Sequence, residues 1–192
     1  MKTLRIVIAD DESLHLMSLR AQLEAMGHRV VGEADDGESA LRLLRDLRPD
    51  LAILDIKMPE PDGIQVAETI MQEQPLPIIL LTAYSEGSLA ERAAHARVAA
   101  YLMKPALPQD LAPTIALATS RFNEFQTLNR KVQDLSDALE TRKLVERAKG
   151  ILMRRLNLSE EEAFHRMQRR SQNENKKMGE IANAIITADG ML

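Results

Sequence analysis

Five polar side chains stand where short apolar runs of the sequence end, and together they could perform phosphoryl transfer. They are Asp10, Asp11, Asp55, Thr82 and Lys104. Three carboxylates that come together repel one another, so we expect a cation beside them. Oxygen ligands suit Mg²⁺, which binds them at roughly 2.0–2.1 Å. A carboxylate flanked by a divalent cation, an ammonium group and a hydroxyl can attack a phosphoryl group, because the cations neutralise the phosphoryl oxygens.

The elements that must bring these residues together alternate between strand and helix. Each predicted strand is a short apolar run, and the predicted helices carry apolar residues on one face. Strands joined by single helices form a parallel sheet with right-handed crossovers, and ligands bind at the carboxyl ends of its strands. The predicted fold class is α/β, a doubly wound five-stranded parallel sheet. We expect strands at 4–9, 29–34, 51–54, 77–81 and 99–102. We expect one helix that ends at Gly27 and three more at 37–47, 64–73 and 86–96.

Each of these polar residues alone has an ordinary structural explanation. A single Asp at a strand end is usually a turn former or a helix cap. Thr82 is a good strand residue, Lys104 alone is typical of a solvated surface, and Tyr101 alone is more often a core residue than a switch. Five chemically suited residues at four strand ends nevertheless favour the functional interpretation.

The motifs at these positions resemble the receiver domain of two-component response regulators, over about residues 3–120. They are Asp10-Asp11-Glu12, Asp55-Ile56-Lys57-Met58-Pro59, Asp62-Gly63, Thr82-Ala83 and Lys104-Pro105.

This resemblance implies that Asp55 accepts a phosphoryl group from a partner histidine kinase. It implies that Thr82 and Lys104 contact that group and that Tyr101 responds by moving inward. Lys104–Pro105 resembles a cis bond of the family, which only an X-Pro peptide tolerates at low cost. The implied Mg²⁺ ligands are Asp10, Asp11, Asp55 and the backbone carbonyl of Ile56.

Net charge differs between the two halves of the chain. The whole sequence carries −4, which alone argues against a nucleic-acid partner. Residues 1–120 contain 11 Lys and Arg against 18 Asp and Glu, a net charge of −7, whereas residues 121–192 contain 14 against 11, a net charge of +3. Residues 142–177 alone contain 11 against 5, a net charge of +6. We therefore expect an acidic domain followed by a basic segment that can meet phosphate.

Composition excludes several other classes. Apolar residues make up 45% and charged residues 28%, which excludes a disordered chain. The absence of cysteine excludes disulfides, thiolate metal sites and cysteine nucleophiles. The four histidines lack metal-ligand spacing, so no zinc site is expected. With no signal-peptide pattern and no apolar stretch of about 18 residues, we expect a soluble cytoplasmic protein with no membrane partner.

A long helix is predicted from Thr114 to Leu156. Pro113 is expected in or near its first turn, because a later proline costs an internal hydrogen bond. Such a helix can carry an apolar seam that packs within the chain or against a second chain. The narrow seam here favours a coiled-coil homodimer, which we expect phosphorylation to enhance. Its residues recur at alternating intervals of three and four: Phe125, Leu128, Val132, Leu135 and Leu139.

A group of three helices is expected beyond the seam. The first ends at Asn157, a residue that adopts the left-handed conformation readily. Ser159 and Glu162 are spaced as a capping box that begins the second helix, and residues 173–177 are expected to form a turn. The residues expected to face the core are Ala163, Phe164 and Met167 in the second helix and Met178, Ile181, Ala182, Ile185 and Ile186 in the third.

Residues 139–188 resemble the ANTAR domain of bacterial RNA-binding transcription antitermination regulators. The runs 146–153 and 159–164 carry the resemblance. The family usually has Leu-Arg and a later Ala at the end of its second helix, where this chain has Met167-Gln168 and Ser171. The candidate RNA-binding residues are Ala148, Lys149, Gly150, Arg154, Arg155, Phe164, Arg169 and Arg170.

These candidates also have structural explanations. Lys149 and the arginines could simply be solvated helix charges. Gly150 inside a helix costs about 1 kcal/mol relative to Ala, so close packing or the close approach of a ligand is expected there. Phe164 is the only aromatic residue after Phe125. Recognition of structured RNA loops by polar side chains is therefore favoured over stacking on aromatic platforms.

The sequence thus predicts a receiver domain at 1–120, a coiled-coil connector at 121–141 and an ANTAR RNA-binding domain at 142–192. The predicted protein is a phosphorylation-dependent response regulator that binds hairpin RNA in nascent transcripts and prevents transcription termination. The alternatives are a DNA-binding helical output domain and a purely protein-binding one. No enzymatic activity is expected beyond autophosphorylation of the receiver and hydrolysis of its aspartyl phosphate.

Overall fold

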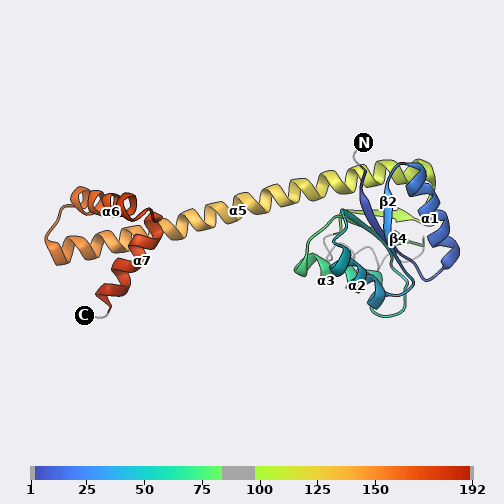
Figure 1. Ribbon diagram of the computed structural model, residues 1–192, viewed down its shortest axis with the longest axis horizontal. Helices are drawn as coiled ribbons and strands as arrows, with labels where there is room; N and C mark the ends of the chain where they lie inside the picture. Colours follow the sequence, from blue (N-terminus) through green and yellow to red (C-terminus); the bar gives the residue numbers. More distant parts are fainter. Residues whose placement is uncertain (1–2, 84–97, 191–192) are drawn as a thin grey trace. The chain divides into compact units, whose positions relative to one another are not determined.

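The chain divides into two compact units, Met1–Gln126 and Thr127–Leu192. The computed structural model describes residues 3–83 and 98–190, so the helix predicted at 86–96 lies outside the described residues. Helix α5 (Pro108–Leu156) contributes its first part to the first unit and its remainder to the second (Figure 1). The boundary between the units therefore falls inside a helix.

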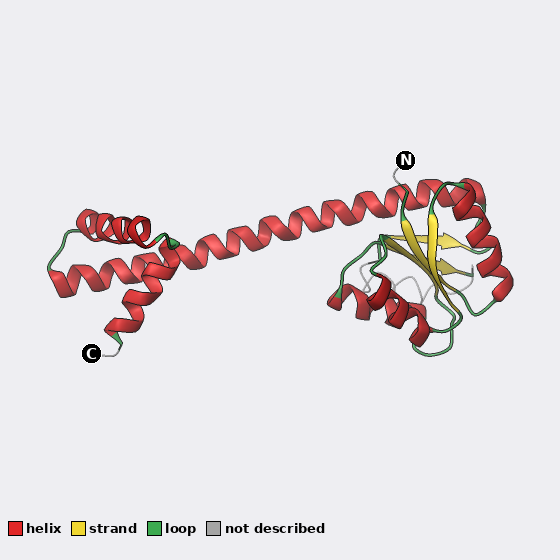
Figure 2. Ribbon diagram, in the orientation of Figure 1, coloured by secondary structure: helices red, strands yellow, loops and turns green. Residues whose placement is uncertain are grey.

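The first unit is built on a five-stranded parallel sheet with strand order β2-β1-β3-β4-β5 (Figure 2). The predicted fold class is confirmed, and each strand lies within about one residue of its predicted position because its apolar run is short and has clear ends. The strands are β1 (Arg5–Ala9), β2 (Arg29–Ala34), β3 (Leu51–Asp55), β4 (Ile78–Thr82) and β5 (Ala100–Met103).

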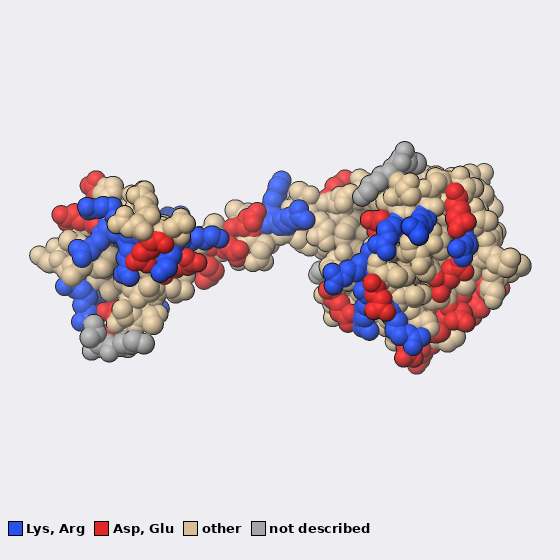
Figure 3. Space-filling model, in the orientation of Figure 1, with Lys and Arg blue, Asp and Glu red and all other residues tan. Residues whose placement is uncertain are grey.

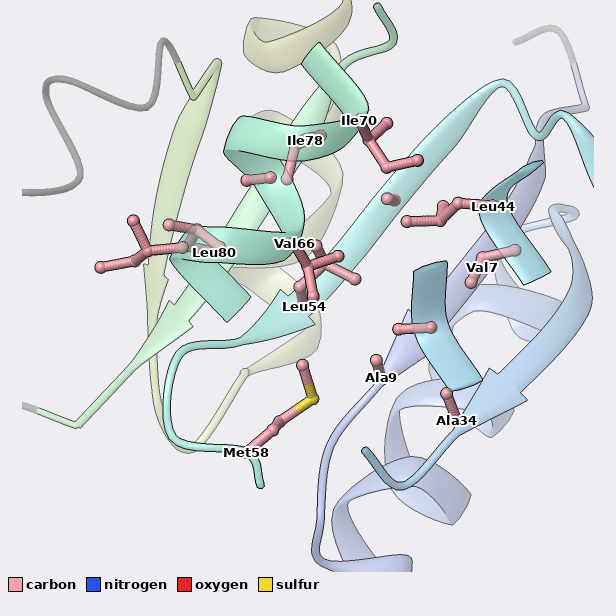
Figure 4. Packing of buried hydrophobic residues seen from close by; sticks show 14 of the residues in the cluster. Val7, Ala9, Ala34, Leu44, Leu54, Met58, Val66, Ile70, Ile78 and Leu80 are labelled. Atoms are coloured by element: carbon pink, nitrogen blue, oxygen red, sulfur yellow. The ribbon is translucent and has the colours of Figure 1, made fainter. Parts of the chain in front are cut away.

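Helices cover both faces of this sheet. Side chains alternate between the two faces of a strand, so Val7 and Ala9 pack against one set of helices while Ile6 and Ile8 pack against another. The first face holds α2 (Gly37–Leu47) and α3 (Gly63–Glu73), and Figure 4 shows part of its core. The second face holds α1 (Ser13–Ala25) and the first turns of α5.

Helix α5 begins six residues before its predicted start, and Pro113 lies inside it rather than in its first turn. Proline has no N–H to donate to the carbonyl four residues earlier, so one helical hydrogen bond is missing. Burial explains why the helix continues past this position: Leu111, Ile115 and Ala118 on one face of α5 are buried in the sheet core. Pro108 suits the first helical position, where its missing N–H costs nothing.

The second unit packs α6 (Glu160–Glu174) and α7 (Met178–Asp189) against the last turns of α5. Two boundary predictions are confirmed: Asn157 has φ 51°, and Ser159 and Glu162 form the capping box of α6. The small core consists of Ala148, Met167, Ile181 and Ala182, with partly buried aliphatic residues around it. None of the helices in the described ranges combines the length and the apolar character needed to cross a bilayer.

The prediction that Phe164 is buried is wrong, since 41% of this residue is exposed. Ala163 and Met167 are four residues apart and lie on the same face of α6, which is the face that the core covers. Phe164 is one residue after Ala163, roughly 100° around the helix. The small core formed by α6, α7 and the end of α5 does not cover that direction as well.

Candidate functional site

Backbone hydrogen bonds that extend the sheet hold the predicted site residues at its carboxyl edge. The Asp10 amide donates to the Ala34 carbonyl (3.1 Å), and the Lys104 amide donates to the Thr82 carbonyl (2.9 Å). Asp55 is the last residue of β3. Because the strands are parallel, all these residues emerge at the same edge.

The side chain of Lys104 joins two buried carboxylates. Its Nζ lies 2.8 Å from Asp10 Oδ2 and 2.8 Å from Asp55 Oδ2. Asp10 is fully buried and Asp55 is 3% exposed. The strand order places β4 between the strands that carry Asp55 and Lys104, so the lysine must span the end of a strand to reach its partners. The peptide bond from Lys104 to Pro105 is cis, as predicted.

Burial and charge set the protonation of this pair. Burial raises the pKa of Asp55 above its ordinary value; the hydrogen bond and charge of Lys104 oppose this rise, and the charge of Asp10 adds to it. For Lys104, burial favours the neutral form, but hydrogen bonds to both carboxylates outweigh it and raise the lysine pKa. A carboxylate whose pKa is raised is more basic and therefore a better nucleophile.

The acidic cluster fits a divalent cation. Asp10, Asp11 and Asp55 each offer a carboxylate oxygen, and these three atoms lie within 4.8 Å of one another. One ammonium group faces three carboxylates, so negative charge remains for a cation to neutralise. An all-oxygen donor set of this kind suits Mg²⁺. The residues that would hold it are therefore the three aspartates.

The other predicted receiver residues lie on β4, on β5 or directly after β3. Thr82 ends β4, and its hydroxyl donates to the Ala83 carbonyl (3.3 Å). Tyr101 on β5 is exposed. The Ile56 carbonyl accepts a hydrogen bond from the Gly63 amide (3.1 Å), so one of its lone pairs is already used. The roles implied for these residues stay predictions.

Two further residues, His15 and Gly63, touch the site, and no role was predicted for either of them from the sequence. His15 Nδ1 lies 3.4 Å from Asp10 Oδ1, and the Glu12 amide donates to the same oxygen (3.0 Å). A Cβ at Gly63 would lie 2.0 Å from the Asp55 carbonyl oxygen, so only glycine lets α3 begin against this strand end. The pair Asp62-Gly63 signalled a helix start, but the contact depends on how α3 packs.

In the helical unit, Lys149 is held by two glutamates. Its Nζ lies 2.6 Å from Glu160 Oε1 and 2.9 Å from Glu146 Oε1, and the residue is 7% exposed. The hydrogen bond to Glu160 and then that to Glu146 raise the lysine pKa. Because Glu160 is the first residue of α6, the lysine ties α5 to the start of the next helix. Ala148 beside it is fully buried.

The remaining RNA-binding candidates differ in how accessible they are. Gly150 is partly exposed, and Arg154, Arg169 and Phe164 are exposed. Arg155 pairs with Asp189 (2.7 Å) and Arg170 with Glu174 (2.6 Å). Figure 3 shows Lys and Arg side chains gathered over this unit, with acidic groups among them. An open groove of about 550 Å³ follows α6 and is lined by Leu158, Glu162, Arg166, Arg169, Arg170, Asn173 and Glu174.

Comparisons with known proteins match both units. The model of the response regulator receiver domain matches residues 6–116, and that of the ANTAR domain matches residues 133–186. The chain belongs to the response regulators with an ANTAR output domain. It is 44% identical over 186 residues to the transcriptional regulatory protein PdtaR of Mycobacterium tuberculosis, covering 97% of this chain and 91% of that protein.

Solved structures match the receiver part of this ANTAR response regulator. A signal receiver domain of a modulated diguanylate cyclase from Desulfovibrio desulfuricans G20 superposes with a TM-score of 0.60 at 33% identity, covering 64% of this chain and 98% of that one. The REC domain of AraT, a response regulator from Geobacillus stearothermophilus, gives 0.58 at 32% identity, covering 65% and 99%. The family relation implies a histidine kinase as partner of the receiver and RNA as ligand of the ANTAR domain.

Gly63→Ala should distort the receiver site. The added methyl group overlaps the Asp55 backbone, so the loop must shift, at a cost of about 1–3 kcal/mol or more in unfolding free energy. We expect slower phosphorylation by acetyl phosphate, followed by mass spectrometry, and a lower urea midpoint. Gly190→Ala is the matched control, because its Cβ would lie 3.7 Å from the nearest atoms. Equal phosphorylation rates in the two variants would contradict this prediction.

Lys149→Met should loosen the α5–α6 connection. The change leaves Glu146 and Glu160 without their shared cation, and we expect the thermal midpoint of the helical unit to fall by several degrees. Lys143→Met is the control, since Lys143 pairs with Glu140 on the same helix but is 70% exposed, and exposed pairs contribute little. Thermal melts followed by circular dichroism measure the midpoint of each variant. If Lys149→Met and Lys143→Met lower the midpoint by the same amount, the prediction is wrong.

Proposed function

We propose that this protein is a phosphorylation-dependent regulator that binds hairpin RNA in nascent transcripts and prevents transcription termination. The observation that carries the proposal is the buried Lys104–Asp10–Asp55 cluster, on the same chain as a basic ANTAR domain. The cluster offers a nucleophilic carboxylate whose charge would change on phosphorylation, and the ANTAR domain offers an output that can respond to that change.

Phosphorylation of Asp55 follows from the chemistry of the cluster. A carboxylate oxygen of Asp55 attacks the phosphorus of a phosphohistidine in the kinase; an O–P bond forms as the N–P bond breaks, and the imidazole keeps the electron pair and takes a proton from water. Mg²⁺ held by the three aspartates would neutralise charge on the phosphoryl oxygens. Lys104 lies beside Asp55 and can pair with one of those oxygens. Beyond this transfer and the later hydrolysis of the acyl phosphate, we propose no enzymatic activity.

The signal is a local change of charge. A phosphoryl group adds about −1.5 to −2 charges to a buried site. Lys104, which pairs with Asp10 and Asp55, must then also pair with the phosphoryl oxygens. The chain runs from Lys104 directly into α5, whose first turns pack on the same sheet. Phosphorylation is proposed to shift this face, with Thr82 and Tyr101 rearranging, and so to bias the output. A change from 1% to 99% active requires about 5.5 kcal/mol of differential stabilisation.

Dimerisation through α5 is part of the proposal. Leu128, Val132, Leu135 and Leu139 are each 59–67% exposed in the single chain. Four large apolar side chains in a row at intervals of three and four are typical of a coiled-coil seam that a second copy covers. We propose that phosphorylation favours this homodimer. Two linked ANTAR domains would then bind RNA with higher affinity than one.

The RNA-binding part of the proposal is supported by charge and by the family. Arg166 and Arg169 are exposed on α6, and among the described residues no ion pair joins either of them to a carboxylate. Such groups can contact phosphate, with an affinity that falls as salt rises. Gel-shift competition between hairpin RNA and duplex DNA tests the class of nucleic acid. Preference for the duplex would favour a DNA-binding output, and no binding to either would favour a protein-binding one.

Asp55→Asn should abolish the response to phosphate donors. The amide is not a nucleophile, so acetyl phosphate with Mg²⁺ should no longer add a phosphoryl group, as measured by mass spectrometry. We expect at least a tenfold loss of the donor-induced gain in hairpin-RNA affinity. Asp46→Asn makes the same chemical change at an exposed position of α2 and should leave both responses intact. RNA binding that stays equally tight in Asp55→Asn and in donor-treated wild type would refute phosphorylation control.

Leu135→Glu should weaken the homodimer. It places a charge in the middle of the seam, where a second copy would bury it, so sedimentation velocity of the donor-treated protein should move from dimer to monomer. Gln133→Glu places the same carboxylate roughly 200° around the helix and should leave the dimer intact. If the wild type stays monomeric with donor and Mg²⁺, the coiled-coil proposal fails.

A further inference from the structure

Gly150 lies in the interior of α5, where a glycine is unfavourable. Glycine at such a position costs about 1 kcal/mol relative to alanine. A left-handed backbone does not require it, because Gly27 is the one glycine of the described ranges with positive φ. Some other constraint must therefore favour the absence of a side chain.

Packing within the chain does not require it either. Beyond its two chain neighbours and the backbone of its own helical turns, a Cβ built at Gly150 would have one neighbour within 4 Å, the guanidinium Nη1 of Arg154 at 4.0 Å. The core of the unit lies on another face of α5, which carries Ala148 and Ile151. The sequence suggested two explanations for Gly150, close packing within the chain and the close approach of a ligand. The structure excludes the first, so the second remains.

Arginines flank this bare position. Arg147 lies three residues before Gly150 and Arg154 four residues after it, so the three share one face of the helix. Both arginines are exposed, and within the described part of the chain no ion pair joins either to a carboxylate. Other bases nearby are engaged: Lys149 pairs with Glu160, and Arg155 pairs with Asp189. The free positive charge on this part of α5 is concentrated beside Gly150.

We propose that the phosphodiester backbone of a bound RNA packs directly onto α5 at Gly150, between Arg147 and Arg154. The proposal rests on the RNA-binding function proposed above and assigns a surface to it. The helix uses the Gly150 amide internally, so the glycine supplies room rather than a donor. The arginines supply the hydrogen bonds and charge, as they do wherever phosphates are bound bidentately.

Charge also decides between RNA and a second copy of the chain as occupant. A symmetric dimer packed at Gly150 would bring four guanidinium groups together with no carboxylate paired to them. That arrangement is unfavourable, whereas a polyanion matches it. The exposed seam residues Leu128 to Leu139 offer the dimer a better surface elsewhere on α5.

The test is Gly150→Ala in the full-length chain. The probe is a hairpin RNA selected by the wild-type protein from a library of hairpins with randomised loops. Alanine should raise the thermal midpoint of the helical unit or leave it unchanged, because it favours helix and, beyond the adjacent residues and the local helix backbone, its Cβ meets no atom closer than 4.0 Å. The dissociation constant for the hairpin should nevertheless rise about tenfold, since the methyl group holds the RNA away from the helix.

Two controls isolate the effect. Gly179→Ala makes the same change in α7, where the Cβ would meet Thr141 at an ordinary contact distance of 3.5 Å, and should leave RNA affinity unchanged. Arg147→Gln and Arg154→Gln should each lower the slope of log K against log salt concentration by about one, as the loss of a phosphate contact does.

The outcomes separate this inference from the proposed function. Weaker RNA binding by Gly150→Ala, with undiminished thermal stability and an unchanged oligomeric state in sedimentation, supports the contact. Wild-type RNA affinity in Gly150→Ala overturns it and leaves the RNA-binding function standing. A loss of dimer in Gly150→Ala assigns the glycine to the subunit contact and also overturns it. If the wild type selects no hairpin at all, both the contact and the proposed function fail.

Discussion

The ion pairs of Lys104 with Asp10 and Asp55 are the constraint on which the receiver unit depends. Two carboxylates that are almost completely buried would each pay a large desolvation cost, and at close range they repel each other. One ammonium group at 2.8 Å from both makes the arrangement possible. The parallel sheet delivers these three groups to one edge from three different strands, and the remaining negative charge explains why the site fits a divalent cation. A reaction that changes the charge of Asp55 therefore changes the electrostatic balance among Asp10, Asp55 and Lys104.

Helix α5 meets different surroundings along its length. Its first turns are part of the receiver core through Leu111, Ile115 and Ala118. Its middle exposes the apolar residues of the seam, and its last turns form the core of the helical unit around Ala148. A helix that is cooperative along its length can transmit a change at its start to residues further on, which gives the proposed phosphorylation control a physical route. The cost of Pro113 inside this helix is offset by the burial of the residues around it.

Much of the fold and of the candidate site could be predicted from sequence because the signals are local. An apolar run that stops at Asp10 or Asp55 marks both a strand and its functional end, and Ser159 with Glu162 marks the start of α6. The errors arose where tertiary contacts override local preference. Pro113 signalled a helix start, but burial of Leu111 draws the helix back to Pro108. Phe164 was expected in a core that has no room for it. The contact of Gly63 with the Asp55 backbone leaves no pattern in the sequence, because it depends on where α3 packs.

The sequence by itself determined the order of strands and helices along the chain, the residues at the strand ends, and the division into an acidic and a basic half. These properties follow from periodicity, from capping and from composition, each of which acts over a few neighbouring residues. The tertiary structure decided which charges are free. Lys149 and Arg155 look alike as basic helix residues, and so do Arg147 and Arg154, yet only the packing of α6 and α7 brings Glu160 and Asp189 to the first two. The pairs Lys149–Glu160 and Arg155–Asp189 join residues 11 and 34 positions apart in the sequence. No local pattern therefore separates these two bases from Arg147 and Arg154, which are exposed and have no ion pair among the described residues.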